Sequence, residues 1–289
     1  MATSLDPVLR DQLLYRRQTL QTSLTESPSS AQLADLLQQV DQALERMDHG
    51  TYGLCEVCHE SVEVERLAAD PLTSFCLDHL PPVAQRALER DLQLARQIQG
   101  GLLPRPESAL GGWQVSYHYQ PAGLVSGDYC DLVDGGARGL YFMLGDVSGK
   151  GIAAAMLMAN LHALFRALIS GGLALGELVS QASRAFCETT LATHYATLVC
   201  GRALASGEVE ICNAGHLPPL HIHAGKVTEL PSTGLPLGMF CSQEFTLTRI
   251  NLQAGDGLLL YTDGLTEAED GSGEFYGPER LQRLVAGHC

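Results

Sequence analysis

Two pairs of side chains in the first third of the chain have the spacing of metal ligands. Cys55 and Cys58 form a CxxC pair, and Cys76 and His79 form a CxxH pair after 17 intervening residues. Each close pair can supply one edge of a tetrahedral zinc site. We therefore predict one Zn²⁺ ion here, with His59 as a less well spaced competitor for the fourth position. The alternative is two buried thiols beside a surface histidine, but paired spacings rarely arise from core packing alone.

Three further motifs place an aspartate beside a glycine at the end of an apolar segment. They contain Asp128, Asp146 and Asp263. Hard cations such as Mg²⁺ and Mn²⁺ take oxygen ligands, and clustered carboxylates repel one another unless a cation lies among them. A single aspartate beside a glycine is most often a turn residue. Metal chemistry is therefore expected only if a folded sheet gathers the three at one edge.

The segment around Lys150 does not have the spacing of a nucleotide-binding phosphate loop. Such a loop needs a glycine separated by four residues from Gly149 and a serine or threonine after the lysine. Leu144 and Gly151 occupy those positions. Lys150 and the free N–H groups of the following helix are still candidates for binding a phosphate group, with a solvated loop lysine as the alternative.

The composition is that of a globular, acidic protein. Of 289 residues, 45% are hydrophobic and 18% charged, and the formal net charge is −15. No segment forms the basic stripe that binding to a nucleic-acid backbone requires, so direct nucleic-acid binding is not expected.

Several features indicate a cytoplasmic protein that does not enter a membrane. The amino terminus has no cationic start followed by an apolar core, as a secretory signal would. The most apolar region, residues 151–176, contains Asn160, His162 and Arg166. The number of cysteines is nine, and most stand singly in apolar segments, so we expect reduced thiols rather than a disulfide framework. Five of them are expected to be inert core residues: Cys130, Cys187, Cys200, Cys212 and Cys241.

The amino-terminal quarter has the pattern of a helical hairpin. Asp6-Pro7 is a helix start, and leucines then recur at helical spacing up to a break at residues 25–30. A second apolar stripe runs from Leu33 to Met47. Each apolar face is narrow, so we expect the two helices to pair. A third helix, ending near Gly100, is expected to connect this region to the next, either paired across a homodimer or solvated.

From Trp113 onward the pattern changes to short strands. Alternating or apolar segments predict several strands in succession, and helices are predicted at about 152–169 and 175–191. Strands that follow one another without intervening helices pair antiparallel, so we expect an α+β domain.

The region of the predicted zinc site resembles a known family. The segments GTYGLCEVC, RLAADP and CLDH are similar to the DksA/TraR zinc finger with its preceding helical hairpin, over roughly residues 30 to 80. In that family the fourth ligand is usually a cysteine, whereas here it is His79. The hairpin tip at residues 27–30 lacks the acidic residues with which DksA proteins act in RNA polymerase. A polymerase role is therefore not carried over, and the module is expected to be structural or sensory.

The second half resembles the SpoIIE and RsbU branch of the metal-dependent (PPM) serine/threonine phosphatases. Six motifs occur in the family's order: SGDYCD, LGDVSGKGIAAAMLMANLHALFRAL, CNAGHLPPL, GLPLG, GDGLLLYTDGLTEAED and FYGPERL. The resemblance starts near Gln99, where ARQIQGGLLP is similar to the helix that leads into this domain. It implies an α/β/β/α sandwich of two mainly antiparallel sheets with a two-metal site between them.

The resemblance also implies a set of site residues. Asp146 would bridge two Mn²⁺ or Mg²⁺ ions, Asp128 and the Val147 carbonyl would complete one ion, and Asp263 would hold the other. His216 would be a proton donor to the leaving group or, more simply, a residue that braces its turn. Lys150 and His216 are thus the expected substrate-binding residues.

One departure concerns the carboxyl end. Family members continue to a closing strand with an Asp-Asp pair, which supplies a ligand of the second metal, whereas this chain stops at Cys289. We therefore expect a sandwich without its last strand. Asp263 would then share its ion with water or with a neighbour such as Asp131 or Glu267, and the second ion would bind weakly unless this is a shortened form.

Together these features predict three segments. Residues 1–80 form a helical hairpin with a zinc finger, 81–104 a linker helix, and 105–289 a phosphatase domain. The expected function is hydrolysis of phosphoserine or phosphothreonine on a regulatory protein, such as an anti-sigma factor antagonist, under control of the zinc module. The alternative is a weak or inactive phosphatase fold that acts as an interaction protein in transcription regulation.

Overall fold

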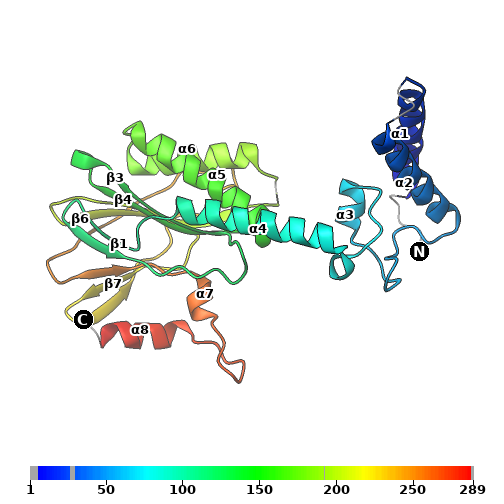
Figure 1. Ribbon diagram of the computed structural model, residues 1–289. Helices are drawn as coiled ribbons and strands as arrows, with labels where there is room; N and C mark the ends of the chain where they lie inside the picture. Colours follow the sequence, from blue (N-terminus) through cyan, green and yellow to red (C-terminus); the bar gives the residue numbers. More distant parts are fainter. Residues whose placement is uncertain (1–5, 27–29, 192, 288–289) are drawn as a thin grey trace. The chain divides into compact units, whose positions relative to one another are not determined.

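The computed structural model describes residues 6–26, 30–191 and 193–287. The chain forms two compact units, Met1–Arg90 and Asp91–Cys289, and each is described by itself. The boundary falls inside helix α4, Pro82–Leu102, which corresponds to the predicted linker helix. Figure 1 shows the helices and strands of both units.

The first unit begins with the predicted helical hairpin. Helix α1, Asp6–Glu26, packs against α2, Ala31–Asp48. The Ser30 hydroxyl caps α2 by accepting a hydrogen bond from the Leu33 amide. Between the helices lies an apolar seam of Leu13, Leu20, Val40, Ala43 and Leu44. Most of the predicted hairpin tip, residues 27–29, lies outside the described residues.

A small module with little regular structure follows the hairpin. It contains helix α3, Val64–Ala69, and the 3₁₀ turn Leu77–His79. Its apolar core is small and consists of Leu9, Cys55, Val62, Leu67 and Cys76. Two of these residues, Cys55 and Cys76, are predicted zinc ligands. A module with so few buried side chains needs a further source of stability, which a structural metal supplies.

The second unit is built on a five-stranded antiparallel sheet in the order β3-β4-β5-β6-β9. The strands are Asp128–Asp134, Leu140–Val147, Ala196–Ala203, Glu208–Ala214 and Thr248–Asn251. Helices α5, Gly151–Ser170, and α6, Leu175–Thr189, cover one face. Both helices lie close to the predicted positions, and the main apolar core is between them and the sheet.

Smaller sheets lie on the opposite side of the large sheet. Strands β10, Gly257–Leu259, β7, Leu220–His223, and β8, Lys226–Glu229, form one of them. Strands β1, Glu107–Leu110, and β2, Trp113–Ser116, form a hairpin. A second apolar cluster joins both to the large sheet. Helix α8, Pro278–Ala286, packs on β7 and β8, which completes the predicted α/β/β/α layers (Figure 1).

The sequence predicted how the strands pair, but it did not predict all of them. The α+β class and the antiparallel arrangement are confirmed. Strands β1 and β8 were not predicted from the sequence; each is a four-residue strand with at most partly buried side chains, so neither has a marked apolar pattern. The expectation about a missing last strand concerns residues beyond 289 and stays a prediction.

Helix α5 is the one helix among the described residues that is long and apolar enough to cross a membrane by length and composition. Its Met158, Leu161 and Phe165 are buried in the core with strands of the large sheet. Packing against the sheet accounts for these three apolar residues of α5.

The expectation that all cysteines are reduced is wrong for one pair. Cys187 in α6 and Cys241 in the loop before β9 form a disulfide, with Cα atoms 5.5 Å apart and a sequence separation of 54. Their proximity arises because the 235–245 loop folds back onto α6, where the Gly238 amide donates to the Ser183 hydroxyl. Cys200 and Cys212 are free and buried, as expected, and Cys130 is free and partly buried.

Candidate metal centres

The pairing of β3 with β4 brings two of the three predicted aspartates together. Asp128 and Asp146 are direct partners in the antiparallel register. Side chains alternate between the faces of a strand, so both carboxylates lie on the face opposite to buried Tyr129 and Val147, which pack under the helices. The carboxylates therefore face the region between the two sheets.

Asp263 approaches the same place from the other sheet. It begins the four-residue helix α7, Asp263–Thr266, shortly after β10. The preceding residue, Thr262, makes a side-chain hydrogen bond to Asp128, and the charge of Asp263 acts on both Asp128 and Asp146. The structure thus brings the three predicted aspartates to one site from segments more than 100 residues apart.

The electrostatics of this site are those of crowded carboxylates. Burial, followed by the charges of Asp128 and Asp263, raises the pKa of Asp146 to about 6. Burial and the charge of Asp263 also raise the pKa of Asp128, although a hydrogen bond from Ser126 opposes the change. Divalent cations would relieve this repulsion, and the donors are all oxygens, so the residues fit Mg²⁺ or Mn²⁺.

The spacing of the aspartates differs from that of a single compact metal site. In the described part of the chain, only one group of three or more His, Cys, Asp or Glu ligand atoms lies within 4.8 Å of one another, and it is the cysteine and histidine group of the first unit. The three aspartates are therefore spread more widely. This spacing is compatible with two cations about 3.5 to 4 Å apart.

Gly127 allows the backbone to pass close to this site. A Cβ atom at Gly127 would lie 2.8 Å from the Val147 carbonyl oxygen and 3.2 Å from Asp146 Oδ1. Any side chain would therefore displace the two groups that the sequence predicted as metal ligands. The Val147 amide in turn donates to the Gly127 carbonyl at 3.3 Å.

Two residues that hold Asp128 in place were not predicted. The Ser126 hydroxyl donates to Asp128 Oδ2 at 2.9 Å. Gln99, in α4, makes two hydrogen bonds to the Ser126 backbone: its Nε2 donates to the carbonyl at 2.7 Å and its Oε1 accepts from the amide at 3.0 Å. Gln99 is 6% exposed. The sequence signal that could have indicated this role is that Gln99 is a polar residue on the apolar face of a helix.

His216 is buried beneath the aspartates and has partners on both ring nitrogens. Nε2 lies 3.1 Å from the Tyr261 carbonyl oxygen, which only accepts, so Nε2 carries the proton. Nδ1 lies 2.8 Å from Thr197 Oγ1, and Thr197 is the register partner of Asp146. Burial lowers the pKa of His216. The geometry is that of a brace between the two sheets, the simpler of the two roles considered from the sequence.

Three other candidates from the sequence are Lys150, Asp131 and Glu267. Lys150 is exposed at the start of α5. Asp131, considered as a substitute ligand, is wrong for that role. It is fully buried on the helix-facing side of β3, on the opposite face of the strand from Asp128. Both its oxygens accept hydrogen bonds from Arg166, at 2.7 and 2.6 Å. Glu267 follows α7 and is exposed.

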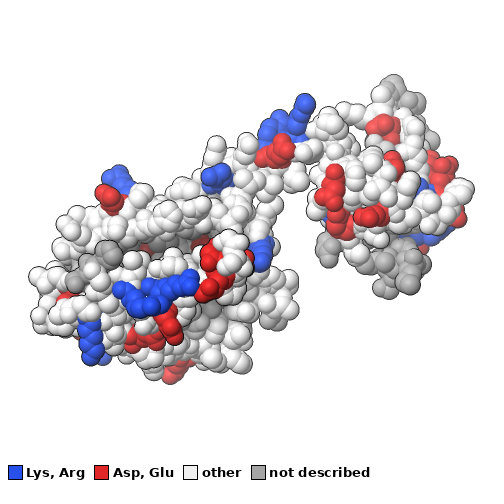
Figure 2. Space-filling view, turned by 90° about the horizontal axis from the view of Figure 1, so that it is seen from below, with Lys and Arg blue, Asp and Glu red and all other residues white. Residues whose placement is uncertain are grey.

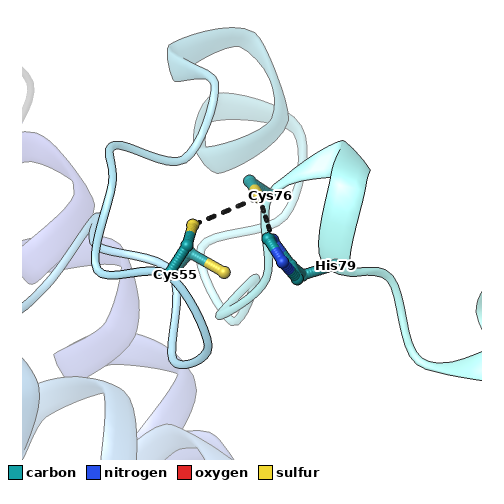
Figure 3. A group of neighbouring side chains, drawn as sticks. Cys55, Cys76 and His79 are labelled. Carbon is teal, nitrogen blue, oxygen red and sulfur yellow. Dashed lines mark hydrogen bonds between the residues drawn. The ribbon is translucent and has the colours of Figure 1, made fainter.

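The four predicted zinc ligands of the first unit converge. One ligand atom from each of Cys55, Cys58, Cys76 and His79 lies within 4.8 Å of the others. The Cys58 and Cys76 sulfurs are 3.8 Å apart, and Cys76 Sγ lies 3.2 Å from His79 Nδ1. Figure 3 shows Cys55, Cys76 and His79 directed toward one another. His59 is exposed and lies outside the group.

The backbone around these cysteines favours the thiolate form of Cys55. Burial raises the pKa of Cys55, but backbone N–H groups, led by that of Cys58, outweigh it and lower the pKa to about 6. Burial and the other two sulfurs raise the pKa of Cys76 to about 11. Thiolates in such a group need a cation, and three sulfurs with one imidazole are a zinc ligand set.

The charged surface has no obvious site for an extended polyanion on the face seen in Figure 2. There, lysine and arginine side chains lie in separate groups, several of them beside aspartates and glutamates. The expectation that the chain does not bind nucleic acid stays a prediction.

Comparisons with known proteins agree with both halves of this description. Residues 136–288 match the family "Stage II sporulation protein E (SpoIIE)", and residues 50–78 match "Prokaryotic dksA/traR C4-type zinc finger". Protein IcfG of Synechocystis is 30% identical over 225 residues, 68% of this chain and 35% of its own length. Phosphoserine phosphatase RsbP of Bacillus subtilis is 31% identical over 187 residues, 62% of this chain and 46% of its own.

The solved structures show a shared fold. The SiaA-PP2C domain of Pseudomonas aeruginosa covers 71% of this chain and 84% of its own, with a TM-score of 0.59 and 21% identity. The chain spans about a third to a half of the length of the two curated relatives above.

Proposed function

Because the chain belongs to the SpoIIE family, we propose that it is a metal-dependent phosphatase that hydrolyses phosphoserine or phosphothreonine on a regulatory protein. The observation that carries this proposal is the convergence of Asp128, Asp146 and Asp263 between the two sheets. The similarity to a protein named phosphoserine phosphatase supports the substrate class.

Each chain residue has a proposed role. Asp146 would be shared by two cations, Asp128 and the Val147 carbonyl would help to hold one of them, and Asp263 would hold the other. When bound, such a pair of cations lowers the pKa of a shared water and neutralises the phosphoryl oxygens. Gln99 positions the Ser126–Asp128 segment through its backbone hydrogen bonds.

Other residues of the site orient the reacting groups rather than take part in bond formation. His216 positions the strand that carries Thr197 and thereby supports Asp146 from below. Lys150 is exposed and attracts the phosphorylated substrate by charge. Hydrolysis by an activated water needs no covalent enzyme intermediate, and the cysteines of this unit have no role in it.

The first unit is proposed to regulate the second. Its ligand set and its family match support zinc, and a module with so small an apolar core depends on that ion for folding. We assign residues 1–80 to this module, 81–104 to the linker helix and 105–289 to the phosphatase domain. Leu94 and Ile98, four residues apart on one face of α4, are exposed, which supports a homodimer through the linker helix. The proposed compartment is the cytoplasm.

Hydrolysis of a phosphoserine protein in the presence of Mn²⁺ tests the function. We expect Asp146→Asn and Asp263→Asn to lose at least about 100-fold in rate, because each removes a charge from the metal site. Asp134→Asn is the matched control, since Asp134 lies at the exposed far end of β3 and Asn keeps its acceptor for the Gly136 amide. Equal rates in all four proteins would refute the assignment.

Calorimetry distinguishes the alternative, a phosphatase fold that only binds its partner. An enzyme takes up Mn²⁺ stoichiometrically in the wild type and loses that uptake in Asp146→Asn. An interaction protein shows no such uptake while it still binds the phosphorylated partner.

A further inference from the structure

Five exposed apolar side chains of the second unit lie near the end of the large sheet that carries Asp128 and Asp146. They form what we call the apolar patch, with exposed fractions from 38% to 68%: Ile152, Met156, Tyr195, Met239 and Phe240. Single exposed apolar residues are normal on a protein surface, whereas a continuous group of them marks a binding surface. Contacts among the segments that carry these five residues place them side by side.

The first contact joins the turn before α5 to the residue before β5. The Ser148 amide donates to the Tyr195 carbonyl at 2.9 Å, and the Tyr195 amide donates to the Ser148 hydroxyl at 2.9 Å. Ile152 lies in the first turn of α5, and Met156 follows one turn later on the same face. The exposed stripe of α5 therefore begins close to Tyr195.

The second contact joins β5 to the loop that carries Met239 and Phe240. Ala196, which directly follows Tyr195, exchanges two backbone hydrogen bonds with Leu237, at 3.0 and 2.8 Å. Met239 and Phe240 come directly after this pairing, and the disulfide described above ties the next residue of the loop to α6. The loop is thus held on both sides of its two exposed apolar residues.

A third contact closes the patch across the two helices. Asn160 lies one turn beyond Met156 on α5, and its side-chain amide donates to the Thr189 hydroxyl at 3.1 Å. Thr189 is the last residue of α6, the helix to which the loop is tied. The stripe of α5, the end of α6 and the loop therefore adjoin one another.

The apolar patch borders the proposed metal site. Val147, whose carbonyl is a proposed metal ligand, directly precedes Ser148 and is the register partner of Ala196. The residues that join the patch together are therefore the immediate neighbours of a residue of the site. A molecule whose phosphate group reaches the aspartates lies next to the patch.

The charge of this surface suits a phosphorylated partner. No aspartate or glutamate occurs in residues 147–157, 189–199 or 234–243, although the chain has a formal net charge of −15. Lys150, which is exposed, lies within the first of these segments. An anionic partner would meet one lysine and no carboxylate on the three segments, so repulsion by the acidic chain is weakest there.

We propose that the apolar patch is the docking surface for the phosphorylated regulatory protein and selects apolar residues that flank its phosphoserine. This inference rests on the proposed phosphatase function. Apolar contacts outside the reacting centre add binding free energy that a phosphate group alone cannot supply, and an exposed aromatic residue such as Phe240 is a typical anchor for them. A second copy of the chain on this surface would crowd the approach to the site, which favours the substrate as the occupant.

Two phosphoserine peptides of equal length and charge test the proposal on the full-length protein loaded with zinc. One peptide has leucine and phenylalanine on both sides of the phosphoserine, and the other has asparagine and serine at the same positions. In the presence of Mn²⁺, we expect the wild type to hydrolyse the apolar peptide with a kcat/KM at least about 10-fold higher than that of the polar peptide.

Variants of the patch should remove this preference. Met156→Asp and Phe240→Asp each place a negative charge in the patch, so both should hydrolyse the two peptides about equally. Leu284→Asp is the matched control, because Leu284 is 50% exposed on α8, in the opposite outer layer of the unit (Figure 1). This control should keep the preference. All the proteins should hydrolyse p-nitrophenyl phosphate at the wild-type rate, since this small ester needs only the metal site, and an equal rate also shows that the variants fold.

Binding of the same peptides, labelled with fluorescein, is measured by fluorescence anisotropy so that the test does not depend on turnover. A wild type that hydrolyses neither peptide nor p-nitrophenyl phosphate would refute the proposed function, whereas tighter binding of the apolar peptide that Met156→Asp abolishes would still support the docking surface. Equal binding of the two peptides by the wild type, or a preference that survives in both variants, would overturn the inference. Self-association of the wild type that both variants abolish, measured by sedimentation, would also overturn it, because a second copy would then cover the patch.

Discussion

Replacing Asp146 with asparagine should abolish activity and at the same time stabilise the metal-free second unit. The reason is that the pKa of Asp146 is raised from 3.8 to about 6 by burial and by its two acidic neighbours. A raised carboxyl pKa means that the charged form is disfavoured in the folded state. Asparagine has the same shape and carries no charge, so it removes this unfavourable term.

The size of the effect follows from the shift. About two pKa units correspond to roughly 3 kcal/mol at 1.36 kcal/mol per unit. Because Asp146 is only partly buried, solvent screening reduces this upper limit, and we expect about 1 kcal/mol. Between pH 3.8 and about 6, the native state binds more protons than the unfolded state. The destabilisation of the folded state by the charged Asp146 is therefore absent below pH 3.8 and complete above about pH 6.

Urea unfolding followed by Trp113 fluorescence, with zinc but without added Mg²⁺ or Mn²⁺, measures the difference. At pH 7.5 the midpoint of Asp146→Asn should exceed that of the wild type, and the two should converge toward pH 4. Asp134→Asn is the control and should lie within about 0.5 kcal/mol of the wild type. An Asp146→Asn protein that is no more stable than this control at pH 7.5 would show that the carboxylates do not repel one another.

Three further predictions concern the supports of the site and the zinc module. Reduction of the Cys187–Cys241 disulfide should destabilise the second unit by up to about 4 kcal/mol on the chain-entropy model, because the bond closes a loop of 54 residues. In the urea assay, the midpoint reported by Trp113 should therefore fall with dithiothreitol in the wild type but not in Cys187→Ser. Gln99→Leu should cost about 1 to 3 kcal/mol in the same assay and weaken Mn²⁺ binding measured by calorimetry, because two partly buried backbone groups of Ser126 lose their partners. Gln97→Leu, at an exposed position of the same helix, should do neither. Cys76→Ser should release zinc and make residues 50–80 sensitive to limited proteolysis, and a protein that keeps one zinc per chain would contradict the ligand assignment.

Local sequence patterns were sufficient for several features. The ligands of the zinc module come in pairs three residues apart, and such pairs lie close together whatever the rest of the chain does. Helices α5 and α6 were predicted within a few residues, because their apolar stripes bury against one sheet.

Other features depended on contacts between distant segments. The resemblance, rather than the spacing of Asp128, Asp146 and Asp263, indicated that they converge, since nothing in their spacing places one sheet on the other. Asp131 was a reasonable substitute ligand until the alternation of β3 placed it beside Arg166.

The sequence by itself therefore determined the composition of the two units and most of the elements within each, but not β1 and β8. Only the tertiary structure decided which residues from different segments meet: Gln99 with Ser126, Cys187 with Cys241, and Ser148 with Tyr195. The physical reason is that helix and strand geometry relates residues a few positions apart, whereas contacts across 27 to 54 residues depend on how sheets, helices and loops pack together.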